Sequence, residues 1–293
     1  MEITQSDMLV WKSKLVDMLK FIQDVCAANG LRYFCVSGTA IGAVRHRGFI
    51  PWDDDIDIVM PRPDYEKLKS IWNSVANGNY EFLSYDNTVG YFYTHSKISS
   101  ASTSLIELDS QNYIEGIYID VFPLDGCSND FADFKKDMDY FRSLYLKLQV
   151  ICEPMNGTVL KGIFRMLKKK NLYFLRYLPY YFIRPLLSRC SLERKLALFV
   201  DKHKYETSDY VAAYSGSYKY KEYVPKKWFG KGTKARFENL EVVIPEHYDE
   251  MLKHFYGNYM ELPPKDKQVS HHFVSYYNLN KRLSLNEARK YIK

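Results

Sequence analysis

Two aspartates separated by a single isoleucine constrain the fold of this chain more than any other feature. Asp55 and Asp57 lie in the stretch WDDDIDIVM, which is bounded by Pro51 and Pro61. Successive side chains of a strand point to opposite faces, so a strand here turns both carboxylates to one face and Ile56 to the other. The pattern therefore predicts a partly buried strand over residues 55–60 whose polar face carries two like charges.

Like charges at this spacing predict a metal site. Two neighbouring carboxylates repel each other unless a cation compensates them. Mg²⁺ prefers carboxylate oxygens and keeps open positions for substrate phosphates. Asp120, in a second apolar strand predicted over residues 117–122, is costly to bury without a partner. We therefore expect Asp55, Asp57 and Asp120 to be the catalytic residues and to bind Mg²⁺ or Mn²⁺.

Two other interpretations of the acidic stretch were weighed. A solvated edge strand is one alternative, but the isoleucines between the acids favour burial. A calcium-binding EF-hand is the other, because Asp53, Asp55 and Asp57 match its first three ligand positions. Ile58 stands where that loop requires glycine, so the EF-hand is rejected.

A Ser-Gly-Thr turn precedes the acidic stretch. Ser37, Gly38 and Thr39 follow a strand predicted over residues 31–36 and open a short helix over residues 40–46. Backbone amides at a helix start favour phosphate, although an ordinary turn has the same composition. A phosphate-binding turn, a helix and an Asp-x-Asp strand, in this order, are typical of the nucleotidyltransferase fold.

The remaining pattern predicts an α+β fold, with a mixed sheet flanked by helices. A helix is expected around residues 15–26 with a stop at Asn29-Gly30, and another after Pro63. Strands are expected between residues 80 and 108 and at 240–244, and Pro123 is expected to end the strand over 117–122. Residues 131–205 read as helical, and a further helix follows Pro245.

The stretch over residues 37–57, SGTAIGAVRHRGFIPWDDDID, resembles the signature of the LicD family. That family includes bacterial phosphocholine transferases and the animal fukutin and fukutin-related proteins. The resemblance continues in residues 118–126, YIDVFPLDG, and returns in short blocks between residues 237 and 264. It is weakest over residues 130–215. The zinc-binding cysteines of the animal members have no match here.

The resemblance implies a phosphotransferase. Such an enzyme takes a CDP-activated donor and transfers a substituted phosphate, phosphocholine or a polyol phosphate, to a glycan hydroxyl with release of CMP. It implies metal ligation by the three aspartates and donor contacts from the 37–39 turn. Asp120 is the preferred acceptor of the hydroxyl proton, although a metal ligand is a poor base. The acceptor is expected to be a cell-surface glycan such as lipopolysaccharide, teichoic acid or capsule, or its lipid-linked precursor.

Three further residues are candidates for donor binding. Arg45 and His46 lie in the family signature, and Lys97 lies in a strand that is expected to face the same region. Charge compensation at a helix end is the structural alternative for Arg45, and solvent exposure is the alternative for Lys97. We expect all three to contact the donor.

Basic residues gather in one segment of a chain whose net charge is +6. They are Lys161, Arg165, Lys168, Lys169, Lys170, Arg176, Arg184, Arg189, Arg194 and Lys195, with Glu193 the single acid among them. Leucine and aromatic residues alternate with them, which suits the surface of an anionic membrane. An anionic substrate is an alternative, and no nucleic-acid motif accompanies the segment, so nucleic acid is not an expected partner.

We expect three parts: a catalytic core over residues 1–128, a basic helical insertion over 129–215 and an α/β extension over 216–293 that packs back on the core. The five cysteines are scattered without a Cys-x-x-Cys pair, which argues against a disulfide framework. The start of the chain lacks a signal-peptide pattern. We therefore expect a cytoplasmic protein on the inner face of the membrane.

Two other functions stay open at this point. A nucleotidyltransferase would use the same fold and the same aspartates to attach a nucleoside monophosphate to a small molecule or a sugar. A membrane-surface scaffold with a degenerate site is the alternative outside enzymes, and the intact acidic residues speak against it.

Overall fold

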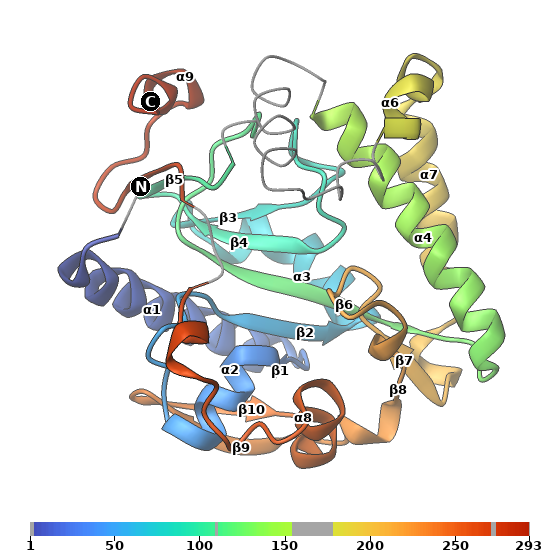
Figure 1. Ribbon diagram of the computed structural model, residues 1–293, viewed down its shortest axis with the longest axis horizontal. Coiled ribbons are helices and arrows are strands. Elements are labelled where there is room, and N and C mark those ends of the chain that lie inside the picture. Colours follow the sequence, from blue (N-terminus) through green and yellow to red (C-terminus); the bar gives the residue numbers. More distant parts are fainter. Residues whose placement is uncertain (1–2, 109–110, 154–177, 271–273, 293) are drawn as a thin grey trace.

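A mixed sheet flanked by helices forms the centre of the protein, which confirms the predicted α+β class. The computed structural model describes residues 3–108, 111–153, 178–270 and 274–292. In the described part the main sheet runs in the order β1-β2-β6-β4-β3, and β7 joins β6 to β8 (Figure 1). Its strands are β1 (Phe34–Cys35), β2 (Asp57–Pro61), β3 (Tyr80–Leu83), β4 (Ser96–Ser100), β6 (Tyr118–Gly126), β7 (Tyr210–Ala212) and β8 (Val224–Pro225).

The pairing of β2 with β6 is parallel, and the other strand pairs of this sheet are antiparallel. Asp57 lies directly beside Asp120, and Asp120 lies directly beside Lys97 of β4. Residues at paired positions of adjacent strands point to the same face. The register therefore places three charged side chains in a row across one face of the sheet.

The opposite face of the sheet packs on two helices. These are α1 (Gln5–Asn29), which ends at Gly30 with a left-handed φ of 63°, and α3 (Arg62–Val75). Leu19 of α1 and Trp72 of α3 share one buried cluster with Ile58 and Ile119 of the strands. Val59, one residue along from Ile58, packs in a different cluster, so the alternation predicted from the sequence is present.

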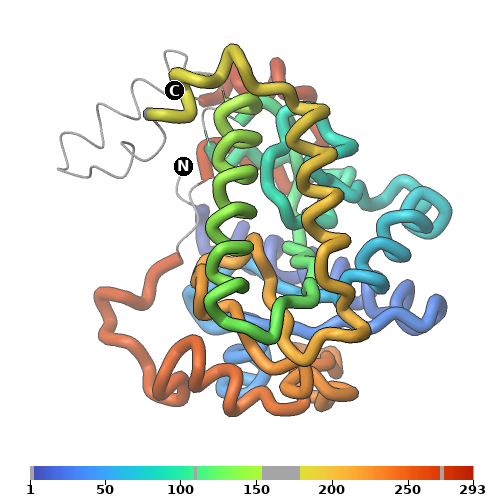
Figure 2. The backbone as a smooth tube through the Cα atoms, turned by 90° about the vertical axis from the view of Figure 1, so that its right-hand side faces the viewer, coloured from blue at the N-terminus to red at the C-terminus, as the bar shows by residue number. Residues whose placement is uncertain are grey.

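A pair of helices covers one end of the sheet. α4 (Phe131–Cys152) and α7 (Arg189–Val200) lie side by side in Figure 2 and share a second buried cluster. Between them in the chain, α6 (Leu178–Ile183) and the 3₁₀ turn η3 (Arg184–Leu186) are described. The interpretation of residues 154–177 as helical and basic lies outside the described residues.

The C-terminal residues return to the sheet. They form β9 (Thr233–Phe237), β10 (Leu240–Ile244), α8 (Tyr248–Tyr256), β11 (Tyr276–Asn278), which pairs with β5 (Ser104–Ile106), and α9 (Leu285–Arg289). Phe237, Val242 and Ile244 lie in the same buried cluster as α1 and β2. In the described part of the chain no helix has the length and apolar character needed to cross a bilayer.

Three predicted boundaries are wrong. The first strand comprises only Phe34–Cys35, and the acidic strand begins at Asp57, so Asp55 precedes it. β6 also continues through Pro123 to Gly126. Pro123 is tolerated because the pairing of β6 with β4 ends at Val121, and β2 is the neighbour of β6 at this position. A proline that lacks an N–H interrupts no ladder on an open side.

A bidentate ion pair holds the far end of β6. Arg62 Nε donates to Asp125 Oδ1 at 2.6 Å and Arg62 Nη2 donates to Asp125 Oδ2 at 2.8 Å. The Asp125 side chain is buried, and that of Arg62 is mostly buried. Arg62 also contacts Glu66, whose side chain is half exposed. The pair therefore fixes the start of α3 against the end of β6.

We expect Asp125→Asn to lower the free energy of unfolding by about 3 kcal/mol or more, because it leaves a buried guanidinium without its counter-charge. Glu66→Gln is the matched control and should change stability by less than about 0.5 kcal/mol, because that ion pair is exposed. Urea denaturation followed by circular dichroism measures both. Equal effects of the two variants would contradict this account of β6.

Candidate functional site

Three aspartates converge at the start of β2. One carboxylate oxygen from each of Asp55, Asp57 and Asp120 lies within 4.8 Å of the other two. Asp55 reaches the group from the segment before the strand. The backbone of this segment is already aligned with β6, because Asp120 N donates to Ile56 O at 3.0 Å. The structure thus brings together the three carboxylates predicted from the sequence, and places Asp120 as the most deeply buried of them.

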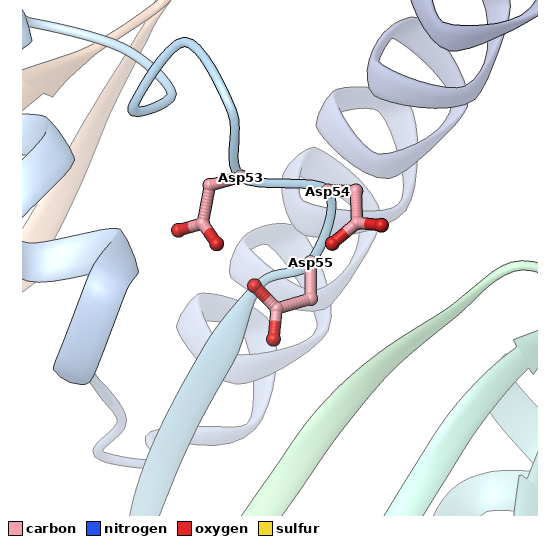
Figure 3. A group of neighbouring side chains, drawn as sticks. All are labelled: Asp53, Asp54 and Asp55. Atoms are coloured by element: carbon pink, nitrogen blue, oxygen red, sulfur yellow. The ribbon is translucent and has the colours of Figure 1, made fainter. Parts of the chain in front are cut away.

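A second acidic group adjoins the first. Asp53, Asp54 and Asp55 also offer oxygens within 4.8 Å of one another, so Asp55 belongs to both groups. Figure 3 shows the three side chains on the segment that leads into β2. Asp54 is buried, and its Oδ2 accepts a hydrogen bond from Ser270 at 2.8 Å. Acidic side chains therefore extend beyond the predicted Asp-x-Asp pair.

The Ser-Gly-Thr segment forms the first turn of α2 (Ser37–Ile41) and supports the aspartates. Thr39 is buried, and its Oγ1 accepts the backbone N–H of Asp57 at 2.9 Å. Gly38 leaves room for Asp53, because a Cβ at this position would overlap Asp53 Oδ2. Thr39 and Gly38 thus position the acidic segment, a role that the predicted donor contact did not include.

Ser37 differs from its two neighbours because it lines a pocket. It has a left-handed backbone, with a φ of 52°, and its side chain hydrogen-bonds with that of Tyr256 on α8. Of the predicted turn residues, Ser37 is the one whose side chain borders open space beside Asp57.

His95 is a site residue that the sequence analysis missed. Its Nε2 lies 3.2 Å from Asp120 Oδ1, and its ring lies 4.4 Å from that of Phe122. His95 lies one residue before β4 and two residues before Lys97. Side chains two residues apart on a strand point to the same face, so His95 lies on the face that carries Lys97 and Asp120. The two-residue spacing of His95 and Lys97 was the signal in the sequence that could have identified His95.

The structure does not support the predicted donor contact of Lys97. The residue is 2% exposed, and its Nζ lies 2.8 Å from Glu107 Oε2 and 3.3 Å from Glu115 Oε2. It also lies over the ring of Tyr118, 3.5 Å from the centroid. Burial alone would lower the pKa of Lys97, but the surrounding carboxylates outweigh burial and raise it. Its charge is therefore committed to a buried ion pair beside Asp120.

Arg45 and His46 end the π-helical turn η1 (Gly42–His46). Arg45 Nη1 donates to the carbonyl oxygens of Tyr259 and Glu261, and Arg45 Nε donates to His46 Nε2 at 2.9 Å. Burial and the adjacent guanidinium lower the pKa of His46. These contacts tie the C-terminal loop to η1, a role that neither expectation for Arg45 included, and the donor contact of Arg45 and His46 stays a prediction.

A pocket with about 820 Å³ of open space, part of it continuous with solvent, borders Asp57. Its floor is the same face of the sheet, since Val59 of β2 and Phe122 and Leu124 of β6 line it. Its remaining walls come from residues 36–40, from Pro245 and α8, and from residues 213–229. Concave sites with mainly apolar walls and a few polar groups are where small organic molecules usually bind. The carboxylates at its edge could bind a divalent cation, because three carboxylate oxygens form a donor set that suits Mg²⁺.

Comparison with known proteins agrees with the resemblance drawn from the sequence. Residues 30–151 match the family model described as "LicD/FKTN/FKRP, nucleotidyltransferase domain". The chain is 27% identical over 271 residues to a protein of Haemophilus influenzae named "Lipopolysaccharide cholinephosphotransferase LicD", which covers 90% of this chain and 95% of the relative. A shorter match, 40% identical over 57 residues, covers 20% of this chain and 21% of an uncharacterized protein of Rickettsia prowazekii.

We expect Asp57→Asn to weaken Mn²⁺ binding by at least about tenfold, because it removes one charged ligand without changing volume. Titration calorimetry with Mn²⁺ measures the affinity, and circular dichroism checks that the fold is kept. Asp24→Asn is the matched control, because Asp24 is exposed and pairs with Lys20 on α1. Equal Mn²⁺ affinity of wild type and Asp57→Asn would exclude Asp57 as a ligand.

Proposed function

We propose that the chain is a metal-dependent phosphotransferase, from the premise that residues 30–151 match the LicD/FKTN/FKRP nucleotidyltransferase domain. It moves a substituted phosphate from a CDP-activated donor to a hydroxyl of a glycan and releases CMP. The observation that carries the proposal is the convergence of Asp55, Asp57 and Asp120 at the edge of an aromatic pocket.

The acceptor and the transferred group follow from the relative of known name. That protein is named as a lipopolysaccharide cholinephosphotransferase, and it aligns with nearly the whole of this chain. A lipopolysaccharide-type glycan as acceptor and phosphocholine as the group transferred are therefore the first choices for testing. A polyol phosphate is the other group that the family resemblance implies.

The carboxylates explain why a divalent cation fits this reaction. Asp55, Asp57 and Asp120 would hold Mg²⁺ or Mn²⁺, which when bound compensates the charge of the donor pyrophosphate and of the departing CMP. The chain's own residues fix the geometry of the acids: Thr39 holds the backbone of Asp57, and His95 contacts the carboxylate of Asp120. Positioning of this kind is most of what an enzyme contributes to phosphoryl transfer.

The reaction exchanges one bond for another. The acceptor hydroxyl oxygen forms a bond to the phosphorus that carries the head group, and the bond from that phosphorus to the CMP oxygen breaks. The proton of the hydroxyl leaves with this exchange, and Asp120 stays the acceptor predicted from the sequence. In nucleotidyl transfer the acceptor would instead bond to the phosphorus next to the nucleoside.

Incubation with CDP-choline, lipopolysaccharide and Mg²⁺ should yield free CMP and a glycan heavier by one phosphocholine group. EDTA should abolish both products, and Asp57→Asn should slow them by about 100-fold or more, because a ligand of the compensating cation is lost. Chromatography of the nucleotides and mass spectrometry of the glycan measure the two products. A mass gain of one cytidylyl group would instead identify a nucleotidyltransferase.

We also propose that the protein works at the surface of an anionic membrane. Phe182 and Leu186 are 80% and 85% exposed, and the exposed basic residues Arg194 and Lys195 follow on α7. Phe182 and Leu186 lie in α6 and η3, at one end of the α4 and α7 pair (Figure 1). Exposed apolar side chains near exposed basic residues in the chain suit the headgroup layer of a bilayer. A lipid-linked acceptor would be reached from this surface.

Phe182→Ser combined with Leu186→Ser should lower binding to phosphatidylserine vesicles by about 100-fold, because each apolar side chain contributes roughly 1.5 kcal/mol when buried. Co-sedimentation measures the bound fraction. Leu262→Ser, a substitution of another exposed leucine outside this segment, is the control and should bind like wild type. If the double variant sediments with vesicles like wild type, α6 and η3 do not contact the membrane.

A further inference from the structure

Aromatic rings form a corner in the pocket beside Asp57. Tyr218 lies 5.7 Å from Tyr256, centroid to centroid, with their planes at 86°, and 5.3 Å from Phe255 with the planes at 54°. All three residues line the pocket, together with Phe122 from the sheet. Rings set at large angles around one space present several π faces to a single occupant. The faces of aromatic rings carry negative potential, which attracts cations.

A buried carboxylate lines the same pocket. Glu222 is 8% exposed, and Oε1 accepts the backbone N–H of Tyr218 at 3.0 Å. Arg142, which donates to the carbonyl oxygen of Gly216, is the nearby cation, and its charge partly offsets the rise that burial causes in the pKa of Glu222. Gly216 provides the space for this carboxylate, because a Cβ there would overlap Glu222 Oε1. Burial still outweighs these contacts, and the lining on the pocket side is mainly apolar and aromatic, so a cationic ligand there would offset part of the hydration that Glu222 has lost.

We propose that this pocket binds a quaternary ammonium head group, with Tyr218 and Tyr256 facing the cation and Glu222 supplying the counter-charge. The proposal rests on the proposed function, because it assigns the pocket to the head group of a donor whose pyrophosphate lies at Asp57. Tyr218, Tyr256 and Glu222 are then the residues that determine which substituted phosphate the enzyme accepts.

Other occupants fit the lining less well. A polyol chain needs hydrogen-bond partners for each hydroxyl, whereas the walls are mainly apolar and aromatic. A cytosine ring would stack on the tyrosines, but it is neutral and gains little from a buried negative charge. A quaternary ammonium group has no N–H to satisfy and needs a negative potential and apolar contact, which this pocket combines. Burial also raises the pKa of Glu222 to about 7, so a bound cation would favour its ionised form.

The test compares two ligands of the same shape. Phosphocholine and its uncharged carbon isostere, 3,3-dimethylbutyl phosphate, differ in the charge of the head group. Wild type should bind phosphocholine at least about tenfold more tightly, and Glu222→Gln should lose most of that preference. Glutamine keeps the acceptor for the Tyr218 N–H, so the fold is preserved. Glu206→Gln, an exposed substitution, is the control and should keep the wild-type preference. Titration calorimetry measures each affinity.

A second pair of variants tests the ring. Tyr218→Ala should weaken phosphocholine binding by about fivefold or more, and Tyr218→Phe should restore most of it, because the π face and not the hydroxyl carries the interaction. CMP is the reference ligand for both variants. If Tyr218→Ala weakens the binding of CMP and leaves the binding of phosphocholine unchanged, the pocket belongs to the nucleobase and the proposal is overturned. Equal wild-type affinity for phosphocholine and its isostere would overturn it as well.

Turnover separates this proposal from the proposed function. Release of CMP from CDP-ribitol, without a preference for the charged head group, would keep the phosphotransferase and reject the ammonium site. Charge-selective binding of phosphocholine, lost in Glu222→Gln, combined with transfer of a cytidylyl group, would keep the ammonium site and reject the phosphotransferase.

Discussion

The parallel pairing of β2 with β6 is the constraint on which the site depends. It sets Asp57 directly beside Asp120, and the segment before β2 adds Asp55. Such an arrangement is unfavourable by itself, because like charges repel and lose hydration. The apolar face beneath it compensates, since Ile58 and Ile119 are fully buried against α1 and α3. The hydrophobic core therefore holds in place a charge arrangement that the site alone would not keep.

The position of Asp120 depends on how β6 is held in the sheet. Asp120 stands next to Lys97, whose charge is balanced by Glu107 and Glu115, and the far end of β6 is held by the pair of Arg62 and Asp125. Ion pairs in the interior require good geometry to offset the loss of hydration. The Arg62–Asp125 pair joins β6 to α3, and the Lys97 pair fixes β4, which is hydrogen-bonded to β6; both restrict how far Asp120 can shift relative to Asp57. Rigid support of this kind is what a site for phosphoryl transfer requires.

Local patterns in the sequence predicted the elements but not the partners of individual side chains. The Asp-x-Asp spacing and the apolar runs were sufficient for the strands and for the meeting of three carboxylates. Lys97 faced the expected side, yet its partners lie on a loop whose path the sequence does not reveal. Pro123 was expected to end a strand, but the effect of a proline depends on which neighbour the strand has there. Glu222 carried no motif at all, and the pocket that it lines is formed by segments distant in the chain.

Alternation along the strands also explains why the aromatic pocket adjoins the acidic group. On one face, β2 places Val59 after Asp57, and β6 places Phe122 and then Leu124 after Asp120. Two residues along each strand, the same surface therefore changes from carboxylate to apolar side chains. A donor that lies along it would meet charge compensation at its pyrophosphate and apolar contact at one end. The two-residue repeat of the strands therefore sets the positions of both the acidic group and the apolar surface. A shift in register would move the two together.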